Sequence, residues 1–468
     1  MKYRSKPTLC KVAITTAFAF LLTAFSPALA DANWPQWRGP HANGLAEGKP
    51  PIEWSETKNV QWKAQIPGQG HGTPVVWGDK IFLLAAVPTG VKAATVTSPP
   101  NKVFGQQRRP DQEERRRRFG QGGSGRGRGG FGRGAKPTEE MAFTTLCLNR
   151  TDGKIIWERI GRAEVPHQGV QSSNKYSAAS AVTDGDRVYA SFGSSGLYCY
   201  DMDGNLLWNK DFGKVSVTFG EASSPAVHGN TLVIVRDNND RSQVVALNAT
   251  TGDELWSRDR DERSGWTTPS FLERHGTTEV LLTGANAVRG YDLSNGEVLW
   301  QCSGLGSNPV PMLLHNDGSI IASSGHRNGA VMAFKLGAKG DLTDTDAVQW
   351  TITRGTPYVP SPLLYHNTLL FCQRNDAILT CVDPASGDIH YQQERVEGVG
   401  GIYASPVGVN GHIYWPTQTG VTMVLKAGKD LTVVAKNKLN DAFDASPVVI
   451  GNQLFLRGHE SLYCLAEQ

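Results

Sequence analysis

The sequence contains few charged residues and, beyond its first 30 residues, no long hydrophobic run. Charged residues make up only 19% of the 468 positions, and hydrophobic residues make up 39%. This composition excludes both a coiled coil and a wholly disordered chain. No apolar stretch after residue 30 approaches the roughly 18 residues that a membrane-spanning helix requires, so a multi-span membrane protein is excluded as well.

Local catalytic and metal-binding motifs are also missing. The seven cysteines include no Cys-x-x-Cys and no adjacent pair, which excludes attached haem, a zinc ribbon and a vicinal disulfide. The 11 histidines show no His-x-x-x-His spacing, and there is no Gly-x-Ser-x-Gly motif and no calcium loop. Local motifs therefore predict no metal site and no catalytic residue.

Positive charge is confined to two parts of the chain. Residues 1–30 carry four Lys and Arg and no acid, and residues 101–136 carry 11 cations against three acids. Because the net charge of the whole chain is only +3, the remaining residues are acidic on balance. A nucleic-acid-binding body is therefore not indicated.

Residues 1–30 are typical of a secretory signal. Four cations precede or flank the start of an apolar run over residues 12–25, and Ala28-Leu29-Ala30 supplies the small residues of a cleavage site. The run is too short to span a bilayer. We predict cleavage after Ala30 and a periplasmic or secreted protein, with residues 31–57 forming a lead-in to a repeat region over residues 58–468.

One phrase recurs eight times: a small residue and usually Pro, an apolar strand, a turn and a second apolar strand. Its copies begin at Thr73, Ser180, Ser224, Thr268, Val310, Ser361, Ser405 and Ser446. After the second copy the spacings are 44, 44, 42, 51, 44 and 41 residues. Periods of about 40–50 residues with alternating apolar strands are typical of β-propeller blades.

A second phrase follows in most units: Asp or Asn, a Gly turn and an apolar pair ending in an aromatic residue. The Gly permits the left-handed turn before the outer strand, and the aromatic ring offers a flat face to the neighbouring blade. The predicted inter-blade docking residues are Trp62, Trp157, Trp208, Trp256, Trp300, Trp350 and Tyr391.

The offset between the two phrases predicts how the propeller closes. Trp62 precedes the first copy of the first phrase, and the last copy, at Ser446, has no outer strand after it. The strand around residues 59–66 must therefore complete the last blade, which removes the exposed sheet edges. We predict an all-β, eight-bladed propeller of four-stranded antiparallel blades, or seven blades if the unit near residue 430 is irregular.

The Ser-Pro-Val-Val strand and the Asp-x-x-x-Gly-x-x-x-Trp turn resemble the PQQ-type propeller repeat. Quinoprotein alcohol dehydrogenases share this repeat with the propeller lipoprotein of the bacterial barrel assembly machine. The opening Trp34-Pro35-Gln36-Trp37-Arg38-Gly39-Pro40 also resembles the lead-in of exported members. The resemblance covers about residues 34–468 without the insertion, and it implies the fold more strongly than the function.

Residues 88–140 interrupt the first blade between its second and third strands. Nine of the 15 residues from Gly120 to Gly134 are Gly, with interspersed Arg. Such a segment cannot bury enough apolar surface to offset its ordering entropy, so we expect a disordered insertion. Its charge would suit an anionic envelope polymer or lipid head groups, and a solvated loop without function is the alternative.

Unusual side chains stand just ahead of the first phrase in most units. In a propeller these connections surround one mouth of the central channel, where a flat ligand or a peptide could bind. The candidate funnel residues are His71, Tyr176, Phe219, Glu221, Trp266, Tyr358, Tyr403, Phe443 and Asp444. The alternative is that these aromatic residues only seal one blade against the next.

These patterns favour an exported, monomeric, non-catalytic propeller that binds an envelope protein or another envelope component. The alternative that the resemblance implies is a PQQ-dependent oxidoreductase acting on an alcohol or sugar. That enzyme would need PQQ with calcium, and Trp266, Glu221 and Asp444 are of suitable residue types. No cofactor is expected under the first interpretation.

Overall fold

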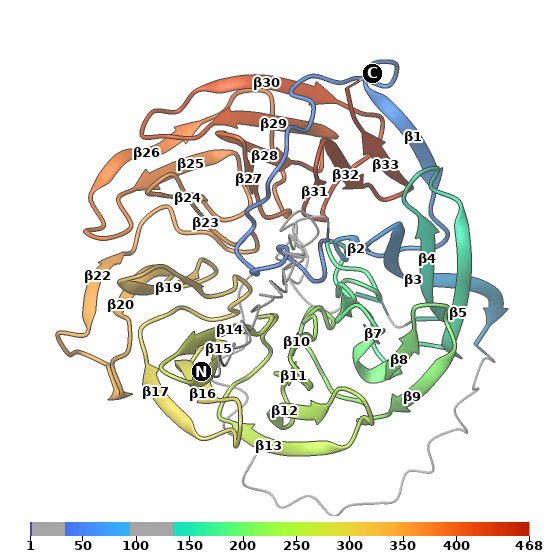
Figure 1. Ribbon diagram of the computed structural model, residues 1–468, viewed down its shortest axis with the longest axis horizontal. Coiled ribbons are helices and arrows are strands. Elements are labelled where there is room, and N and C mark those ends of the chain that lie inside the picture. Colours follow the sequence, from blue (N-terminus) through green and yellow to red (C-terminus); the bar gives the residue numbers. More distant parts are fainter. Residues whose placement is uncertain (2–32, 94–133, 136, 468) are drawn as a thin grey trace, which may run out of the picture. The chain divides into compact units, whose positions relative to one another are not determined.

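The computed structural model describes residues 1, 33–93, 134–135 and 137–467. The described residues from 33 to 467 form eight sheets, in which the four blade strands are antiparallel, arranged around a common centre (Figure 1). The predicted eight-bladed β-propeller is thus confirmed, and the seven-bladed alternative is wrong. The predicted signal segment lies outside the described residues, apart from Met1.

Blades 1 to 4 follow one another along the chain. Blade 1 contains β2 (Val75–Trp77), β3 (Lys80–Lys92), β4 (Glu139–Asn149) and β5 (Ile155–Glu164). Blade 2 contains β6 (Val182–Thr183), β7 (Arg187–Ser191), β8 (Leu197–Asp201) and β9 (Leu206–Lys210), with the 3-10 turn η3 (Gly193–Ser195). Blade 3 contains β10 (Ala226–His228), β11 (Thr231–Arg236), β12 (Ser242–Asn248) and β13 (Glu254–Arg260). Blade 4 contains β14 (Ser270–Arg274), β15 (Thr277–Leu282), β16 (Val288–Asp292) and β17 (Val298–Cys302), with β21 (Gly340–Asp341) as a fifth, parallel strand.

Blades 5 to 8 complete the circle. Blade 5 contains β18 (Leu314–His315), β19 (Ser319–Ser324), β20 (Ala330–Lys335) and β22 (Val348–Ile352). Blade 6 contains β23 (Leu363–Tyr365), β24 (Thr368–Cys372), β25 (Ile378–Val382) and β26 (Ile389–Arg395). Blade 7 contains β27 (Val407–Val409), β28 (His412–Pro416), β29 (Val421–Lys426) and β30 (Val433–Lys438). Blade 8 contains β31 (Val448–Ile450), β32 (Gln453–Arg457), β33 (Ser461–Leu465) and β1 (Val60–Gln65).

The N-terminal strand closes the last blade, as predicted. β1 runs antiparallel to β33, with Trp62 opposite Cys464 and Ala64 opposite Leu462. In Figure 1 the blue β1 lies beside the dark red β33 at the rim. β33 is therefore paired on both sides, by β32 and β1, and its outer edge is not exposed.

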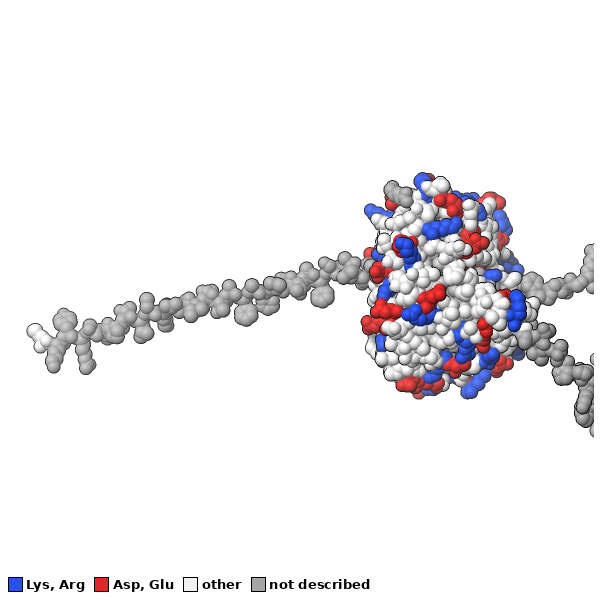
Figure 2. All heavy atoms as spheres, turned by 90° about the vertical axis from the view of Figure 1, so that its right-hand side faces the viewer, with Lys and Arg blue, Asp and Glu red and all other residues white. Residues whose placement is uncertain are grey.

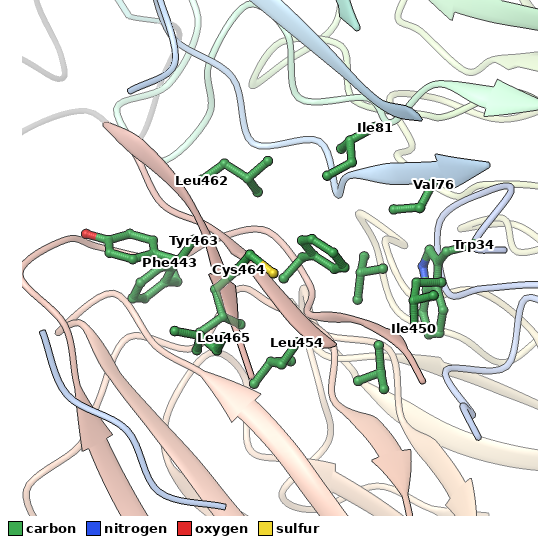
Figure 3. Close-up of a cluster of buried hydrophobic side chains, with 14 of the residues drawn as sticks. Trp34, Val76, Ile81, Phe443, Ile450, Leu454, Leu462, Tyr463, Cys464 and Leu465 are labelled. Carbon is green, nitrogen blue, oxygen red and sulfur yellow. The ribbon is translucent and has the colours of Figure 1, made fainter. Parts of the chain in front are cut away.

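The hydrophobic core lies between neighbouring blades. The second and third strands of a blade bury both faces, as in the fully buried β33, whereas outer strands such as β5 alternate between exposed and buried residues. The largest cluster joins blades 7, 8 and 1 and includes Trp34 from the lead-in (Figure 3). The alternating pattern of the outer strands therefore follows from having a single packed face.

Hydroxyl side chains of the first phrase form a ring of hydrogen bonds around the channel. Each accepts the backbone N–H of the corresponding residue in the preceding blade. The donor–acceptor pairs are Thr73–Ser180 (2.8 Å), Ser180–Ser224 (2.9 Å), Ser224–Thr268 (3.1 Å), Met312–Ser361 (3.0 Å), Ser361–Ser405 (2.9 Å), Ser405–Ser446 (3.0 Å) and Ser446–Thr73 (3.1 Å). The small polar residue of the repeat thus satisfies a buried donor at seven of the eight blade junctions.

The ring of hydrogen bonds shows that the predicted start of the first phrase in blade 5 is wrong by two residues. In the other blades the hydroxyl residue stands two positions before the first strand, as Ser361 does before Leu363. In blade 5 that strand begins at Leu314, so the equivalent residue is Met312 and not Val310. Met312 lacks a hydroxyl, and the ring has no side-chain link from blade 4 to blade 5.

Five of the predicted docking tryptophans lie over the Gly turn of the next blade. The pairs are Trp62–Gly153, Trp157–Gly204, Trp208–Gly252, Trp256–Gly296 and Trp350–Gly387. Each indole also donates to a backbone carbonyl in that turn, at 2.7–3.1 Å. At Gly204, φ is +83° and an added Cβ would come within 2.8 Å of the Trp157 ring, so only Gly combines this turn with this contact.

The other two docking residues differ. Trp300 donates to Glu279 Oε2 in its own blade at 2.8 Å, and the next turn is replaced by the segment that contains β21. Tyr391 packs against a cluster shared by blades 6 and 7.

Trp256→Ala should lower the free energy of unfolding by about 3–5 kcal/mol, the usual cost of removing a buried Trp side chain. Trp256 is only 7% exposed, whereas the adjacent Leu255 on the same strand is 52% exposed. Leu255→Ala is therefore the matched control and should change stability by no more than about 0.5 kcal/mol. Urea unfolding of the two variants measures the difference, and equal midpoints would contradict a docking role for Trp256.

The lead-in segment crosses several blades. Trp34 pairs with Val76 of blade 1, and Gly48 pairs with Gly451 of blade 8. The Arg38 guanidinium is 1% exposed and donates to the carbonyls of Ser361 and Pro362 in blade 6. The lead-in therefore packs against the propeller and forms hydrogen bonds with it, and it is not a free linker.

Strands extend into both ends of the predicted insertion. β3 continues to Lys92 and β4 begins at Glu139, so these parts of residues 88–140 belong to blade 1. Residues 94–133, which hold most of the Arg/Gly-rich sequence, lie outside the described residues.

The six cysteines after residue 30 are free and buried. All six lie in strands, and the Cys372 thiol donates to the Arg374 carbonyl. Within the described ranges, no helix has the length and apolar character needed to cross a membrane. Acidic and basic side chains are interspersed over the side of the propeller shown in Figure 2.

Candidate functional site

A central cavity of about 700 Å³ lies where the connections between blades converge. Six of the nine predicted funnel residues line it: His71, Phe219, Trp266, Tyr358, Tyr403 and Asp444. All six come from connections between the outer strand of one blade and the first strand of the next. The structure therefore brings together side chains that are far apart in the sequence. Thr73 and Ser446, for example, both line the cavity and are separated by 373 residues.

Tyr176 and Glu221 line a second, smaller cavity. Glu221 Oε1 accepts the backbone N–H of Ser194 at 2.9 Å, and burial raises the pKa of the Glu221 carboxyl. Tyr176 donates its hydroxyl to the Gln168 carbonyl at 3.3 Å, and burial raises its pKa too. Glu221 is consequently held by its own blade junction and does not line the central cavity.

The prediction that Phe443 lines the funnel is wrong. Its side chain is fully buried and packs edge-on against Tyr463, with ring centroids 5.9 Å apart. An apolar ring next to the exposed turn of blade 8 gains more by joining the inter-blade core than by facing the cavity.

Aromatic rings form one part of the cavity lining. Trp266 stacks on Phe219 with ring centroids 5.4 Å apart, and its indole donates to the Gly220 carbonyl at 2.6 Å. Trp37 of the lead-in also lines the cavity and donates to Ser446 Oγ at 3.2 Å. These contacts fix the rings without a ligand, so the apolar surface is already formed.

Two arginines add positive charge to the lining. Arg327 follows β19 and Arg374 follows β24, and both side chains are exposed. Burial, together with the charges of these two arginines, lowers the pKa of His326 between them in the lining. Within the described part of the chain neither arginine forms an ion pair, and Asp444 is the one acidic residue of the lining.

A cluster of two histidines and a carboxylate occupies one side of the cavity. The Asp444 side chain is 3% exposed, and its Oδ2 lies 2.6 Å from His459 Nε2 and 3.3 Å from His71 Nε2. The two imidazole rings are stacked, with centroids 4.9 Å apart. Gln418 Nε2 donates to the other carboxylate oxygen of Asp444 at 2.7 Å.

The cluster holds a charged carboxylate beside a neutral imidazole. Burial lowers the pKa of His71 to about 4, although the Asp444 carboxylate opposes this shift. Burial alone would raise the pKa of Asp444, but the hydrogen bond from His459 and the neighbouring His71 outweigh it, so the pKa lies below its usual value. At neutral pH Asp444 is therefore an anion facing two imidazoles.

Sequence reasoning missed His459, Arg327, Arg374 and Trp37. The arginines stand in connections between the second and third strands of their blades, which open on the same face as the connections that the sequence singled out. Applying the blade register to both kinds of connection would have found them. His459 stands in the β32–β33 turn, which is the same kind of connection in blade 8, so the register would have placed it near the channel mouth as well. No local spacing, however, pairs it with His71.

Eight four-stranded blades around a lined cavity make the protein a β-propeller with a candidate ligand site at its centre. A family model described as "Outer membrane protein assembly factor BamB" matches residues 143–393, more than half of the chain. The chain belongs to this family of PQQ-like propellers, which confirms the resemblance seen in its repeats.

Solved structures share the fold at low sequence identity. Quinohemoprotein alcohol dehydrogenase from Comamonas testosteroni is 10% identical, with a TM-score of 0.59 over 93% of this chain and 80% of its own. A europium-containing methanol dehydrogenase is 9% identical, with a TM-score of 0.57 over 92% and 91%. The computationally designed Ika8 protein is 11% identical, with a TM-score of 0.50 over 72% and 95%. No curated protein sequence matches the chain.

Proposed function

We propose that the protein is an exported, non-catalytic binding propeller whose central cavity holds an acidic segment of an envelope protein. The observation that carries this proposal is the cavity lining, in which Arg327 and Arg374 have no acidic partner among the described residues and stand with fixed aromatic rings. Arginine binds carboxylates through paired hydrogen bonds, and the rings can pack against apolar parts of a peptide. The family description, an assembly factor, supports a protein as the partner.

A calcium- and PQQ-dependent oxidoreductase is the alternative, and the residues present do not fit it. Glu221, a carboxylate of the type that could bind calcium, lines the smaller cavity and accepts the backbone N–H of Ser194. In the central cavity, Asp444 is the one acidic residue of the described lining, and its Oδ2 faces two imidazole nitrogens rather than the oxygen ligands that Ca²⁺ prefers. No reaction step through the quinone is derived for this chain.

The proposal is tested with a short fluorescein-labelled peptide rich in Glu and Phe, followed by fluorescence anisotropy. The Arg327→Gln/Arg374→Gln variant should bind it about tenfold more weakly, because exposed charge pairs contribute up to about 1 kcal/mol each. Arg354→Gln is the matched control, since Arg354 is exposed but does not line the cavity.

Equal affinities for the double variant and the control would contradict the proposed site. A parallel titration uses PQQ with Ca²⁺, followed by Trp fluorescence and dye-coupled alcohol oxidation. Saturable quenching with turnover would overturn the non-catalytic proposal in favour of the oxidoreductase.

A further inference from the structure

The His71, His459 and Asp444 cluster contains three ligand atoms of the types that bind transition metals. One imidazole nitrogen from each histidine and one Asp444 oxygen all lie within 4.8 Å of one another. His71 comes from the β1–β2 connection, Asp444 from the β30–β31 connection and His459 from the β32–β33 turn. The three elements meet at the junction of blades 8 and 1, next to the strand that closes the propeller.

One of these atoms has no hydrogen-bond partner among the residues that the structure describes. The His71 side chain is 10% exposed, and its Nε2 is buried without a hydrogen bond although it lies 3.3 Å from Asp444 Oδ2. A buried polar atom left in this state carries a desolvation cost that a ligand at the same point would offset. The unpaired nitrogen therefore points to a missing occupant between the three side chains.

The backbone holds His71 rigidly in this position. Its N–H donates to the Ser177 carbonyl at 3.1 Å, and it stands between Gly70 and Gly72. An added Cβ at Gly72 would come within 2.2 Å of the Ala179 carbonyl, so the chain packs too closely here for any other residue. His71 is thus presented to the cluster by a segment with little freedom to move.

Outer contacts orient the Asp444 side chain and hold the backbone of His459. Gln418 fixes one oxygen of Asp444 and leaves Oδ2 directed at the histidines. The backbone N–H of His459 donates to Asp441 Oδ1 at 2.9 Å. Hydrogen bonds from such outer groups are the usual means by which proteins orient metal ligands.

We propose that His71, His459 and Asp444 bind one divalent transition-metal ion, with Zn²⁺ as the ion that their chemistry matches best. Two imidazole nitrogens and one carboxylate oxygen suit zinc, whereas Ca²⁺ and Mg²⁺ prefer oxygen ligands. Ligands about 2.0–2.1 Å from a tetrahedral ion lie about 3.3 Å apart, which is the distance from His71 to Asp444. His459, the most exposed of the three at 37%, has room to adjust.

The ion would take the place of the proton between His459 Nε2 and Asp444 Oδ2, which lie 2.6 Å apart, and the neutral imidazole would then carry that proton on Nδ1. Three protein ligands leave a fourth position open, and both His71 and Asp444 line the central cavity. The open position therefore faces the cavity, where water or a ligand carboxylate can complete the coordination. This inference does not depend on the acidic-peptide proposal, since metal binding is measured without a peptide.

The test is titration of the purified, tag-free protein with Zn²⁺ by calorimetry and with Co²⁺ by visible absorption. We expect one Zn²⁺ per chain and the visible Co²⁺ absorption bands of a tetrahedral site. His459→Gln should weaken Zn²⁺ binding at least tenfold and abolish those bands. His459 is the variant of choice because its partial exposure makes it the ligand least needed for folding.

His326→Gln is the matched control, because His326 lines the same cavity outside the cluster. It should leave the stoichiometry, the affinity and the Co²⁺ spectrum unchanged. Asp444→Asn provides the second variant and should also lose the Co²⁺ bands. Binding that is absent in the wild type, or that His326→Gln weakens as much as His459→Gln, would overturn the proposal.

Discussion

Arg260→Met should destabilise the propeller by about 3–5 kcal/mol, because it leaves a buried carboxylate without its counter-ion. The Arg260 and Asp237 side chains are 0% and 1% exposed, and two hydrogen bonds of 2.8 and 3.1 Å join them. Arg260 also donates to the Tyr291 hydroxyl at 2.8 Å and to the Thr283 carbonyl at 3.1 Å. The guanidinium thereby links the last strand of blade 3 to the third strand of blade 4 and to Thr283, which directly follows the second strand.

The charges in this pair depend on each other. Burial alone would lower the pKa of Arg260, but Asp237 and Tyr291 outweigh that effect and raise the pKa above its usual value. Removing either partner leaves the other charge buried, whereas removing both leaves an apolar gap that can repack. The double variant Asp237→Leu/Arg260→Met should therefore lose less stability than the sum of the two single variants.

Guanidinium unfolding of the purified proteins measures this difference. The matched control is Arg241→Met, because Arg241 pairs with Asp259 in the same blade at 71% and 60% exposure. Solvent screens that pair, so its loss should shift the midpoint only slightly. An Arg260→Met midpoint no lower than that of Arg241→Met would show that the buried pair adds nothing to the blade junction.

The fold was predictable because nearly every blade contains the same three sequence features. A hydroxyl before the first strand, a left-handed Gly turn and an aromatic residue on the outer strand recur at a nearly constant period. The prediction failed in blade 5, where no hydroxyl residue stands before the first strand. Val310-Pro311 resembles the phrase there, but Met312 occupies the position that the hydroxyl residue has in the other blades. Even there the strand itself was predicted, since its apolar pattern does not need the hydroxyl.

The candidate site was predictable only in part. The topology assigns connections to the channel mouth, and this placed Trp266, Tyr358 and Asp444 correctly in the lining. The topology does not determine whether a side chain in such a connection packs into the core between blades, as Phe443 does, or faces the cavity. The meeting of His71 with His459, across almost the whole chain, arises from closure of the circle and has no signature in local spacing.

Closure itself depends on the N-terminal strand, so a chain that begins at residue 67 should fail to form a stable propeller. The deletion removes the outer strand of blade 8 and exposes the edge of β33. It also removes Trp62, which lies over Gly153 and donates to the Arg150 carbonyl of blade 1 at 3.0 Å. Trp34 and Arg38 are lost with it, and both are buried.

The loss should exceed the total stability of about 5–15 kcal/mol that folded domains possess, and the expected product is aggregated protein. Size-exclusion chromatography and circular dichroism after refolding measure the outcome. Adding a synthetic peptide of residues 34–66 during refolding should restore monomeric, folded protein, because the peptide supplies β1 to the edge of β33. A peptide in which Trp62 is Ala should restore less, since it lacks the contact with blade 1. Normal folding of the truncated chain without peptide would show that blades 1 and 8 associate without the strand, and that closure by β1 is dispensable.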